Sequence, residues 1–565
     1  MDTPIYTPPE NPLFNMARYC IAASAAATPG KPALIVVASP DATPSEIWTY
    51  ADLEDAVLRT AGALRALGLA PGDRVMIRLD NTSAYAILFF GAIAAGLVAL
   101  PASNQLTDRE ALFLLQDSAA AALASALPLQ EAQPSEIATY LDPRLRRDGG
   151  SGRRTGLLIS DVTPTEVGVQ TRLPQETIGR RSDPPLARDT TPLILSPDDV
   201  ARMMREGPRI DYAATHAEDP AFLIYTSGTT ANPKGVLHAN RVAIGRRPMY
   251  QGWYGIGGED RVFHAGAFNW TFTLGVGLTD PWANGATAII YTGEKEPALW
   301  PRLINRTGAT IFAGVPALMR QILKYGNVTP RTMPSLRHAL IAGEAPPPGL
   351  FEAWRAQTGT DLYEGLGMSE LSTYISTAPT VPRKPGTVGK AQPGRNVVII
   401  PVEGENVPLP PDTEGLVAVH RSDPGLMLGY WNRPAEQADV VRGEWFVGGD
   451  LGRMDAEGYI THEGRNNEII KALGYRVSPA EVEAVLAQHP DVAEVACAEV
   501  AVRADVHVVG AFIVPKGEAR PDSEAIRAFA SERLAAYKCP REIRFLDKLP
   551  RTANGKIRRA VLANA

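Results

Sequence analysis

Residues 221–235 read AFLIYTSGTTANPKG, a strand-like apolar run that ends in a loop of hydroxyl side chains and glycine. Glycine lets backbone N–H groups turn toward an anion, and Ser and Thr hydroxyls donate further hydrogen bonds to it. Lys234 adds a positive charge near the end of the loop. The spacing is not the G-x-x-x-x-G-K-[ST] of a Walker A loop. The stretch therefore predicts a phosphate-binding loop that follows a β-strand.

Short strand-like runs alternate with helical patterns on both sides of this loop. Examples of such runs are residues 74–78, 288–291 and 339–341. This alternation is typical of βαβ units with largely parallel sheets. We therefore expect an α/β fold, with a large N-terminal domain made of layered sheets and helices.

The composition describes an ordinary globular chain. Of its 565 residues 45% are apolar and 21% are charged, and the net charge is −6. This charge provides no general attraction for nucleic acid or anionic membranes, so we expect neither as a partner. Cys20, Cys497 and Cys539 are too few and too dispersed for a disulfide framework, and the N-terminus lacks a signal-peptide pattern. These features favour a cytoplasmic location.

Residues 83–106 carry no charge and resemble a membrane span in composition. Gly91 and Gly96 divide the stretch, a β-prone run follows, and Pro101 ends it. A buried helix that leads into a buried strand explains the pattern better than membrane insertion does.

Residues 141–192 differ from the rest of the chain. They contain nine Arg, no Lys and seven acidic residues, with little periodic apolar pattern. Because the acidic residues nearly cancel the arginines, we interpret the segment as a surface insertion rather than a nucleic-acid site.

The last hundred residues or so resemble a separate small α+β unit. Helices are predicted at 479–489 and 523–536, and strands at 506–514 and 543–546. The boundary is predicted near 465–467, which gives domains 1–466 and 467–565.

The loop also resembles a known family signature. Tyr-Thr-Ser-Gly-Thr-Thr-x-x-Pro-Lys-Gly is similar to the signature of the adenylate-forming superfamily, which includes acyl-CoA synthetases, nonribosomal peptide adenylation domains and firefly-type luciferases. The resemblance covers nearly the whole chain except 141–192, and its pattern is most similar to medium-chain or aromatic acyl-CoA synthetases. Further matches follow in the family's order: Gly343-Glu344-Ala345, Gly367-Met368-Ser369-Glu370, residues 445–450, Gly464-Arg465, residues 474–479 and residues 550–556.

The resemblance implies a role for each matched residue in binding ATP and Mg²⁺. Glu370 would hold the Mg²⁺ that bridges the phosphates, and Asp450 would accept both ribose hydroxyls. Lys556 would be the catalytic lysine, with Glu370 and Thr226 as further catalytic residues. The implied ATP-binding set is Thr226, Ser227, Gly228, Thr229, Thr230, Lys234, Gly343, Glu344, Ala345, Glu364, Gly365, Ser369, Glu370, Asp450, Arg465 and Lys556.

In this family the small C-terminal domain moves about a hinge between two half-reactions. The resemblance places the hinge at Asn467, where relatives usually have Asp or Lys. Gly474 and Arg476 would then lie near coenzyme A, the co-substrate that brings the thiol.

The acyl pocket is implied by Trp270, Gly314 and Gly367. Trp270 falls where acetyl- and medium-chain acyl-CoA synthetases have a tryptophan. Acetate-restricted relatives have a second tryptophan where this chain has Gly367, so we expect a deeper pocket here. Leu366 stands where many relatives have an aromatic residue that stacks on adenine.

The resemblance therefore implies an ATP-dependent carboxylic acid:CoA ligase that forms an acyl-adenylate. The expected acid is medium-chain, alicyclic or aromatic, and its small-molecule partners are that acid, ATP and CoA. The alternative is a stand-alone adenylation enzyme that loads a carrier protein. An oligomer is compatible with the sequence.

Overall fold

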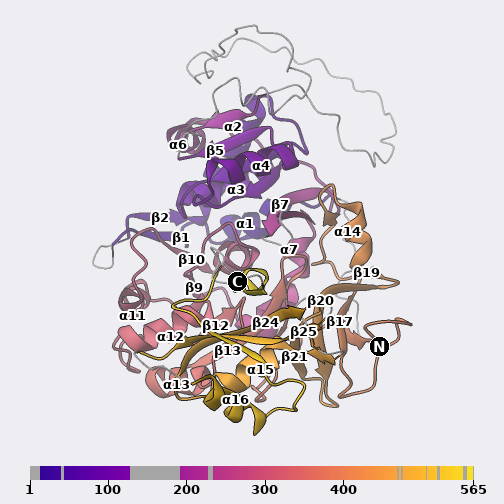
Figure 1. Cartoon of the computed structure of the whole chain (residues 1–565). Coiled ribbons are helices and arrows are strands. Elements are labelled where there is room, and N and C mark those ends of the chain that lie inside the picture. The colour runs from indigo at the N-terminus through magenta and orange to yellow at the C-terminus, as the bar shows by residue number, and fades with distance from the viewer. Residues whose placement is uncertain are drawn as a thin grey trace.

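The computed structural model describes residues 13–39, 44–126, 191–226, 233–466, 470–472, 475–503, 506–517, 522–551 and 557–563. Within these ranges the chain forms α/β layers, as the alternating pattern predicts (Figure 1). The expected surface insertion at 141–192 lies almost entirely outside the described residues. No helix in the described part is long and apolar enough to cross a membrane.

A seven-stranded sheet carries the predicted phosphate loop, and the strands of this sheet that come first in the chain lie in the upper, indigo to purple part of Figure 1. Its central strands are parallel, and β7 and β8 form an antiparallel edge with β18. In sheet order its strands are β18 (Gly429–Tyr430), β8 (Lys234–Ala239), β7 (Pro220–Thr226), β4 (Val98–Pro101), β3 (Arg74–Arg78), β5 (Ala122–Ser125) and β6 (Leu193–Leu195).

The helices of this part include the uncharged stretch at 83–106. It forms α3, whose residues are nearly all buried, followed by the buried strand β4, which confirms the predicted helix and strand. α2 begins with a capping box in which Thr49 and Asp52 satisfy each other's backbone N–H groups. The helices are α1 (Met16–Ala27), α2 (Tyr50–Ala66), α3 (Ser83–Ala94), α4 (Asp108–Ser118) and α6 (Pro197–Glu206).

A nine-stranded sheet forms the second layer, and its central six strands are parallel. Its strands in sheet order are β15 (Lys390–Ala391), β14 (Ser372–Ser376), β13 (Asp361–Met368), β12 (His338–Ala342), β11 (Ile311–Gly314), β9 (Arg261–His264), β10 (Thr287–Tyr291), β1 (Pro32–Val37) and β2 (Glu46–Thr49). The accompanying helices are α7 (Val242–Gly245), α8 (Arg247–Met249), η3 (Tyr250–Tyr254), α9 (Thr271–Leu274), η4 (Gly275–Thr279), α10 (Asp280–Ala283), η5 (Pro297–Leu299), α11 (Trp300–Thr307), α12 (Pro316–Tyr325) and α13 (Leu350–Thr358).

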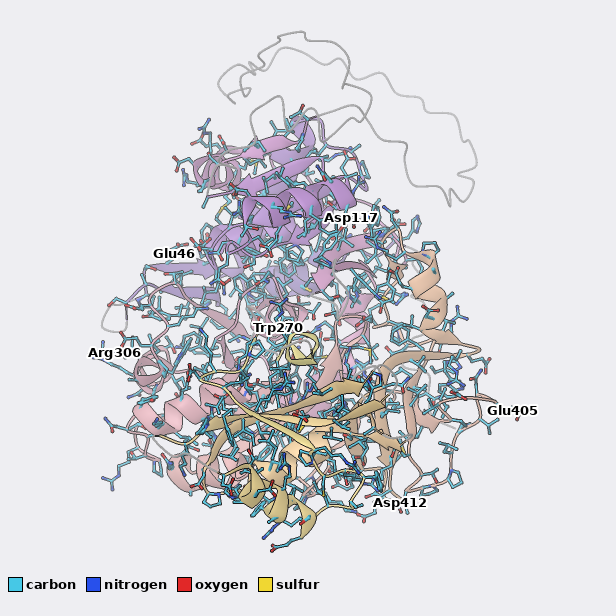
Figure 2. The ribbon with its side chains drawn as sticks, in the orientation of Figure 1. Glu46, Asp117, Trp270, Arg306, Glu405 and Asp412 are labelled. Carbon is cyan, nitrogen blue, oxygen red and sulfur yellow. The ribbon has the colours of Figure 1, made fainter. Side chains whose placement is uncertain are left out.

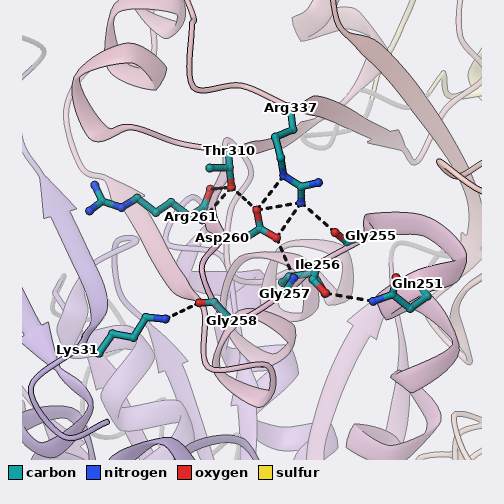
Figure 3. Close-up of polar contacts among 10 residues, drawn as sticks. All are labelled: Lys31, Gln251, Gly255, Ile256, Gly257, Gly258, Asp260, Arg261, Thr310 and Arg337. Atoms are coloured by element: carbon teal, nitrogen blue, oxygen red, sulfur yellow. Dashed lines mark hydrogen bonds and ion pairs between the residues drawn. The ribbon is translucent and has the colours of Figure 1, made fainter.

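The amino ends of this sheet are tied together by Asp260 (Figure 3). Its carboxylate accepts hydrogen bonds from Arg337 Nη2 at 2.8 Å, Thr310 Oγ1 at 2.7 Å and the backbone N–H of Gly257 at 2.8 Å. Asp260, Thr310 and Arg337 each directly precede a strand of the sheet. The opposite, carboxyl ends of the strands are the usual ligand-binding edge of such a sheet.

A smaller antiparallel sheet follows in the chain, in the orange part of Figure 1. It contains β16 (Val397–Ile400), β17 (Gly415–His420), β20 (Trp445–Met454), β19 (Val441–Arg442) and β21 (Ile460–Arg465), with α14 (Pro434–Asp439) beside it in sequence.

The C-terminal residues form their own sheets, drawn in yellow in Figure 1. The predicted helices are present but shorter, because α15 ends at Leu486 and α16 at Ser531. The elements are β22 (Ile470–Ala472), β23 (Tyr475–Val477), α15 (Pro479–Leu486), β24 (Val492–Arg503), β25 (Val506–Pro515), α16 (Ser523–Ser531), β26 (Glu542–Phe545) and α17 (Arg559–Ala563). The division at 466/467 stays a prediction, since 467–469 lie outside the described residues.

Candidate active site

The strand that leads into the predicted phosphate loop is firmly anchored. The Tyr225 hydroxyl donates to Asp117 Oδ2 at 2.7 Å, and Arg433 Nη2 donates to Asp117 Oδ1 at 2.9 Å. Asp117 lies in the upper, purple part of the molecule in Figure 2. Thr226 and Lys234 are paired in the ladder between β7 and β8, so the two ends of the loop lie side by side. Ser227, Gly228, Thr229 and Thr230 lie outside the described residues.

Lys234 and Glu370 are brought together by Tyr430. The Lys234 ammonium lies 5.3 Å from the centre of the Tyr430 ring, and the Tyr430 hydroxyl donates to Glu370 Oε1 at 2.7 Å. Burial raises the pKa of Tyr430 and the charge of Glu370 raises it further, so the phenol stays protonated and remains a donor. Three distant segments therefore converge at the predicted phosphate end of the site.

A magnesium ion would suit the donor chemistry at this point. A single carboxylate that projects beside a phosphate loop fits Mg²⁺, which usually binds one or two protein carboxylates together with substrate phosphates. Glu370 supplies that carboxylate, and its present partner is a neutral hydroxyl rather than a cation.

Two residues that the sequence did not predict, His238 and Arg246, form hydrogen bonds to residues that flank Glu370. His238 Nε2 lies 2.8 Å from the carbonyl oxygen of Ser369. Burial lowers the pKa of His238 to about 4, so the ring is neutral at physiological pH and donates through Nε2. Arg246, buried and paired with Asp280 at 2.6–2.7 Å, donates to the Ser372 hydroxyl on the other side of Glu370.

The predicted ribose end is formed by β20 and β21. Asp450 is 3% exposed, and its Oδ1 lies 3.3 Å from Arg465 Nε. The two residues are opposite each other in the strand ladder, as their predicted common role requires. Burial raises the pKa of Tyr374 well above its ordinary value, and the charges of Asp450 and Glu370 raise it further. Tyr374 therefore lies within electrostatic range of both Asp450 and Glu370.

One predicted adenine segment directly follows its strand, and the other lies in the middle of the adjacent parallel strand. Residues 343–345 follow β12 directly, while Glu364 and Gly365 belong to β13. Glu344 Oε1 accepts the backbone N–H of Ala317 at 2.9 Å, so this carboxylate caps the start of α12. Burial raises the pKa of Glu364 to about 7, and the nearby His462 opposes part of the rise.

The predicted acyl pocket has an aromatic wall. Trp270 is half-buried, packs edge to face on Phe272 with ring centres 5.2 Å apart, and lies in the central part of the molecule in Figure 2. Its indole presses on Gly343, where an added Cβ would come within 2.5 Å of the ring. Glycine at 343 is thus required by the close approach of Trp270.

Two predicted pocket glycines are explained by packing. An added Cβ at Gly367 would come within 2.8 Å of the backbone of Ser372 and Thr373, so β14 occupies the space. At Gly314 an added Cβ would lie 3.2 Å from Leu318 Cδ2. The idea that Gly367 deepens the pocket stays a prediction, and the local packing does not favour it.

The residues predicted for the mobile domain are not described. Asn467, Gly474 and the catalytic Lys556 lie outside the described residues, as does the side chain of Arg476. Their roles stay predictions.

The family model described as AMP-binding enzyme matches residues 21–431, and the AMP-binding enzyme C-terminal domain matches residues 481–556. The chain is 31% identical to benzoate–CoA ligase of Thauera aromatica, with 92% of this chain and 91% of the relative covered. It is also 31% identical to acyl-coenzyme A synthetase ACSM5, mitochondrial, of Homo sapiens, over 91% of this chain and 83% of that relative.

The fold is similar to that of the anthranilate CoA ligase AuaEII, whose structure was solved in complex with anthranoyl-AMP. The identity is 26%, the TM-score is 0.79, and 98% of this chain and 97% of that chain are covered. The expected large α/β domain with a small C-terminal domain is confirmed by this similarity and by the two family matches.

Proposed function

The chain belongs to the AMP-binding enzyme family as an AMP-forming acid–CoA ligase that works through an acyl-adenylate, and we propose that its acid is an aromatic monocarboxylate. The single observation that carries the proposal is the flat indole of Trp270 packed against Gly343, beside the predicted adenine segment. A planar wall offers a flat acid more contact than it offers a flexible chain.

The neighbourhood of Trp270 is apolar and aromatic. Residues 265–274 contain no charged side chain, and Phe272 is buried behind the indole. A charged group on the acid would therefore lack a partner along this wall. The benzoate ligase and the anthranilate ligase among the similar proteins act on aromatic acids, as their names say, which adds support.

The proposed first half-reaction joins the acid to ATP. The acid's carboxylate attacks the α-phosphorus, and pyrophosphate leaves. The protein positions and neutralises the reactants, since no protein nucleophile is needed. Lys234 and the loop would hold the phosphates, Asp450 the ribose, and Lys556 the charge that develops at the α-phosphate. A Mg²⁺ ion bound to Glu370 would supply charge neutralisation across the phosphates.

In the proposed second half-reaction the CoA thiol attacks the acyl-adenylate carbonyl, and AMP leaves. Gly474 and Arg476 would lie near the thiol after the C-terminal domain has moved about Asn467.

A panel of acids scored by CoA-dependent AMP formation tests this proposal. Benzoate and its substituted forms are expected to give the highest kcat/KM, cyclohexanecarboxylate and hexanoate lower values, and acetate the lowest. Highest activity with acetate or a straight-chain acid would contradict the aromatic assignment. AMP formation that requires a carrier protein in place of CoA would favour the carrier-loading alternative.

Substitution of Trp270 sharpens the test. Trp270→Ala is expected to raise the KM for benzoate by roughly tenfold, because most of the contact of one aromatic face is lost. Trp445→Ala, which removes a half-buried indole from the start of β20, is the matched control and should leave the ranking of acids unchanged.

A further inference from the structure

His462 on β21 contacts the carboxylate that is proposed to bind ribose. His462 Nε2 lies 3.2 Å from Asp450 Oδ1, the same oxygen that faces Arg465 Nε at 3.3 Å. Both donors come from one strand and reach one carboxylate oxygen on the neighbouring strand.

A β-bulge makes this arrangement possible. Gly464 pairs with Leu451 and His462 pairs with Gly452, so Glu463 is the extra residue on its strand. Without the bulge, residues three apart would point to opposite faces of the sheet. The bulge therefore turns His462 and Arg465 toward the face that carries Asp450.

Two local features stabilise the bulge. Gly464 has a φ of +109°, a conformation that glycine adopts readily and other residues rarely adopt. The Ser478 hydroxyl donates to the carbonyl oxygen of Glu463, the extra residue. The position of His462 is thus determined by features on both sides of it.

The charged and titratable groups around His462 come from several strands. Asp450 lies on β20, Arg465 on β21 and Glu364 on β13. Burial would lower the pKa of His462, but the hydrogen bond and charge of Asp450 outweigh it and raise the pKa above its ordinary value. The imidazole is therefore well suited to donate to Asp450.

We propose that His462 is a positioning residue for the ribose. Together with Arg465 it holds the Asp450 carboxylate in one orientation, so that the carboxylate is already oriented to accept both ribose hydroxyls when the nucleotide binds. The inference rests on the proposed function, in which Asp450 accepts those hydroxyls. A carboxylate held by two donors on one oxygen loses little rotational freedom when the nucleotide binds.

The test compares two nucleotides. Dissociation constants are measured by calorimetry for ATP and for 2′,3′-dideoxy-ATP, which lacks both hydroxyls. His462→Phe is expected to weaken ATP binding by roughly five- to tenfold, the value of about one typical net hydrogen bond, and dideoxy-ATP binding by less than about twofold. His462→Gln, which keeps an N–H donor, should recover most of the ATP affinity.

A merely structural role would give different results. Equal losses for the two nucleotides, or no loss for ATP, would overturn the positioning role. At saturating ATP the turnover of His462→Phe should stay within about twofold of wild type, since the residue does not touch the reacting atoms.

Asp450→Asn separates this inference from the proposed function. If Asp450→Asn weakens ATP more than dideoxy-ATP while His462→Phe does not, the ribose assignment stands and only the role of His462 fails. If Asp450→Asn affects both nucleotides equally, the ribose assignment fails, and the inference about His462 fails with it.

Discussion

The two ends of the nine-stranded sheet both contain carboxylates, but these carboxylates differ in their surroundings and in their hydrogen-bond partners. At the amino ends, both oxygens of Asp260 accept hydrogen bonds, from Arg337, Thr310 and Gly257 (Figure 3). At the carboxyl ends, burial raises the pKa of Glu364 to about 7, and Glu370 is bound by a neutral phenol. The carboxylate at the amino ends therefore already has its hydrogen-bond partners, whereas the carboxylates at the carboxyl ends can gain partners when a ligand binds.

This difference separates two kinds of substitution. Changes at the amino ends should lower stability and leave KM values unchanged, because the proposed ligand site lies at the other end of the sheet. Changes at the carboxyl ends should alter kinetics with little effect on folding.

The largest effect is expected for Lys556→Ala. In the proposed mechanism the C-terminal domain supplies Lys556, which completes the site at the carboxyl ends of the sheet. Adenylation should fall by roughly 100- to 1,000-fold, because a positive charge at the developing transition state is lost. Thioester formation from a supplied acyl-adenylate should be nearly unchanged. Single-turnover assays of the two half-reactions measure this, and equal losses in both would disprove the two-conformation model.

Glu370→Gln comes next. We expect turnover to fall by about 100-fold and the Mg²⁺ concentration for half-maximal rate to rise, since an amide is a poorer ligand for a hard cation. Tyr430→Phe is the matched control, because it removes only the hydroxyl that contacts Glu370. Rates measured across a Mg²⁺ titration should change far less in Tyr430→Phe, and the melting temperatures of both variants should stay near that of wild type.

Asp260→Ala tests the other end of the sheet. It leaves Arg337, Thr310 and Gly257 without their common acceptor, so the free energy of unfolding should fall by about 2–3 kcal/mol. The KM values for ATP and acid should not change. Arg355→Ala breaks an exposed ion pair with Asp361 and should cost less than about 0.5 kcal/mol in denaturant titration. A raised KM for ATP or acid in Asp260→Ala would contradict the proposal that the amino ends contribute only to stability.

The smallest effect concerns the pH dependence of stability at Glu364. Its pKa is raised to about 7 in the fold, while the unfolded value is near 4.5, so the folded state binds more protons between these values. Its contribution to stability is therefore favourable below about pH 4.5 and is lost as the pH rises through about 7. Glu364→Gln should be more stable than wild type by about 1 kcal/mol above pH 7 and no more stable near pH 4.5.

Thermal melts of wild type and Glu364→Gln from pH 4.5 to 8 measure this difference. Glu405→Gln, an exposed control at the periphery in Figure 2, should melt in parallel with wild type. A constant offset between Glu364→Gln and wild type would contradict the raised pKa.

Local pattern was sufficient to predict many elements of the fold. Strands β3, β10 and β12 lie where short apolar runs predicted them, and the uncharged stretch became α3 and β4. Helix ends were less accurate, because α16 stops at Ser531 where the predicted helix continued to 536. β24 and the antiparallel sheet around β20 were not foreseen, although most of their pairs join strands that follow each other in the chain.

The predicted nucleotide-binding residues could be named from sequence only through the family resemblance. The residues that contact and orient them could not be predicted from sequence. Tyr430 is 60 residues from Glu370 and Arg246 is 126 from Ser372, so no local spacing relates either pair. His462 was missed because the bulge at Glu463 decides which face its side chain takes, and a regular strand would have turned it away from Asp450.

Exchange of labelled pyrophosphate into ATP, measured with benzoate and Mg²⁺ in the absence of CoA, tests the central claim most directly. The account predicts exchange that depends on the acid and needs no thiol, followed by release of AMP once CoA is added. Failure to exchange pyrophosphate with any carboxylic acid, although the folded protein is present, would contradict it.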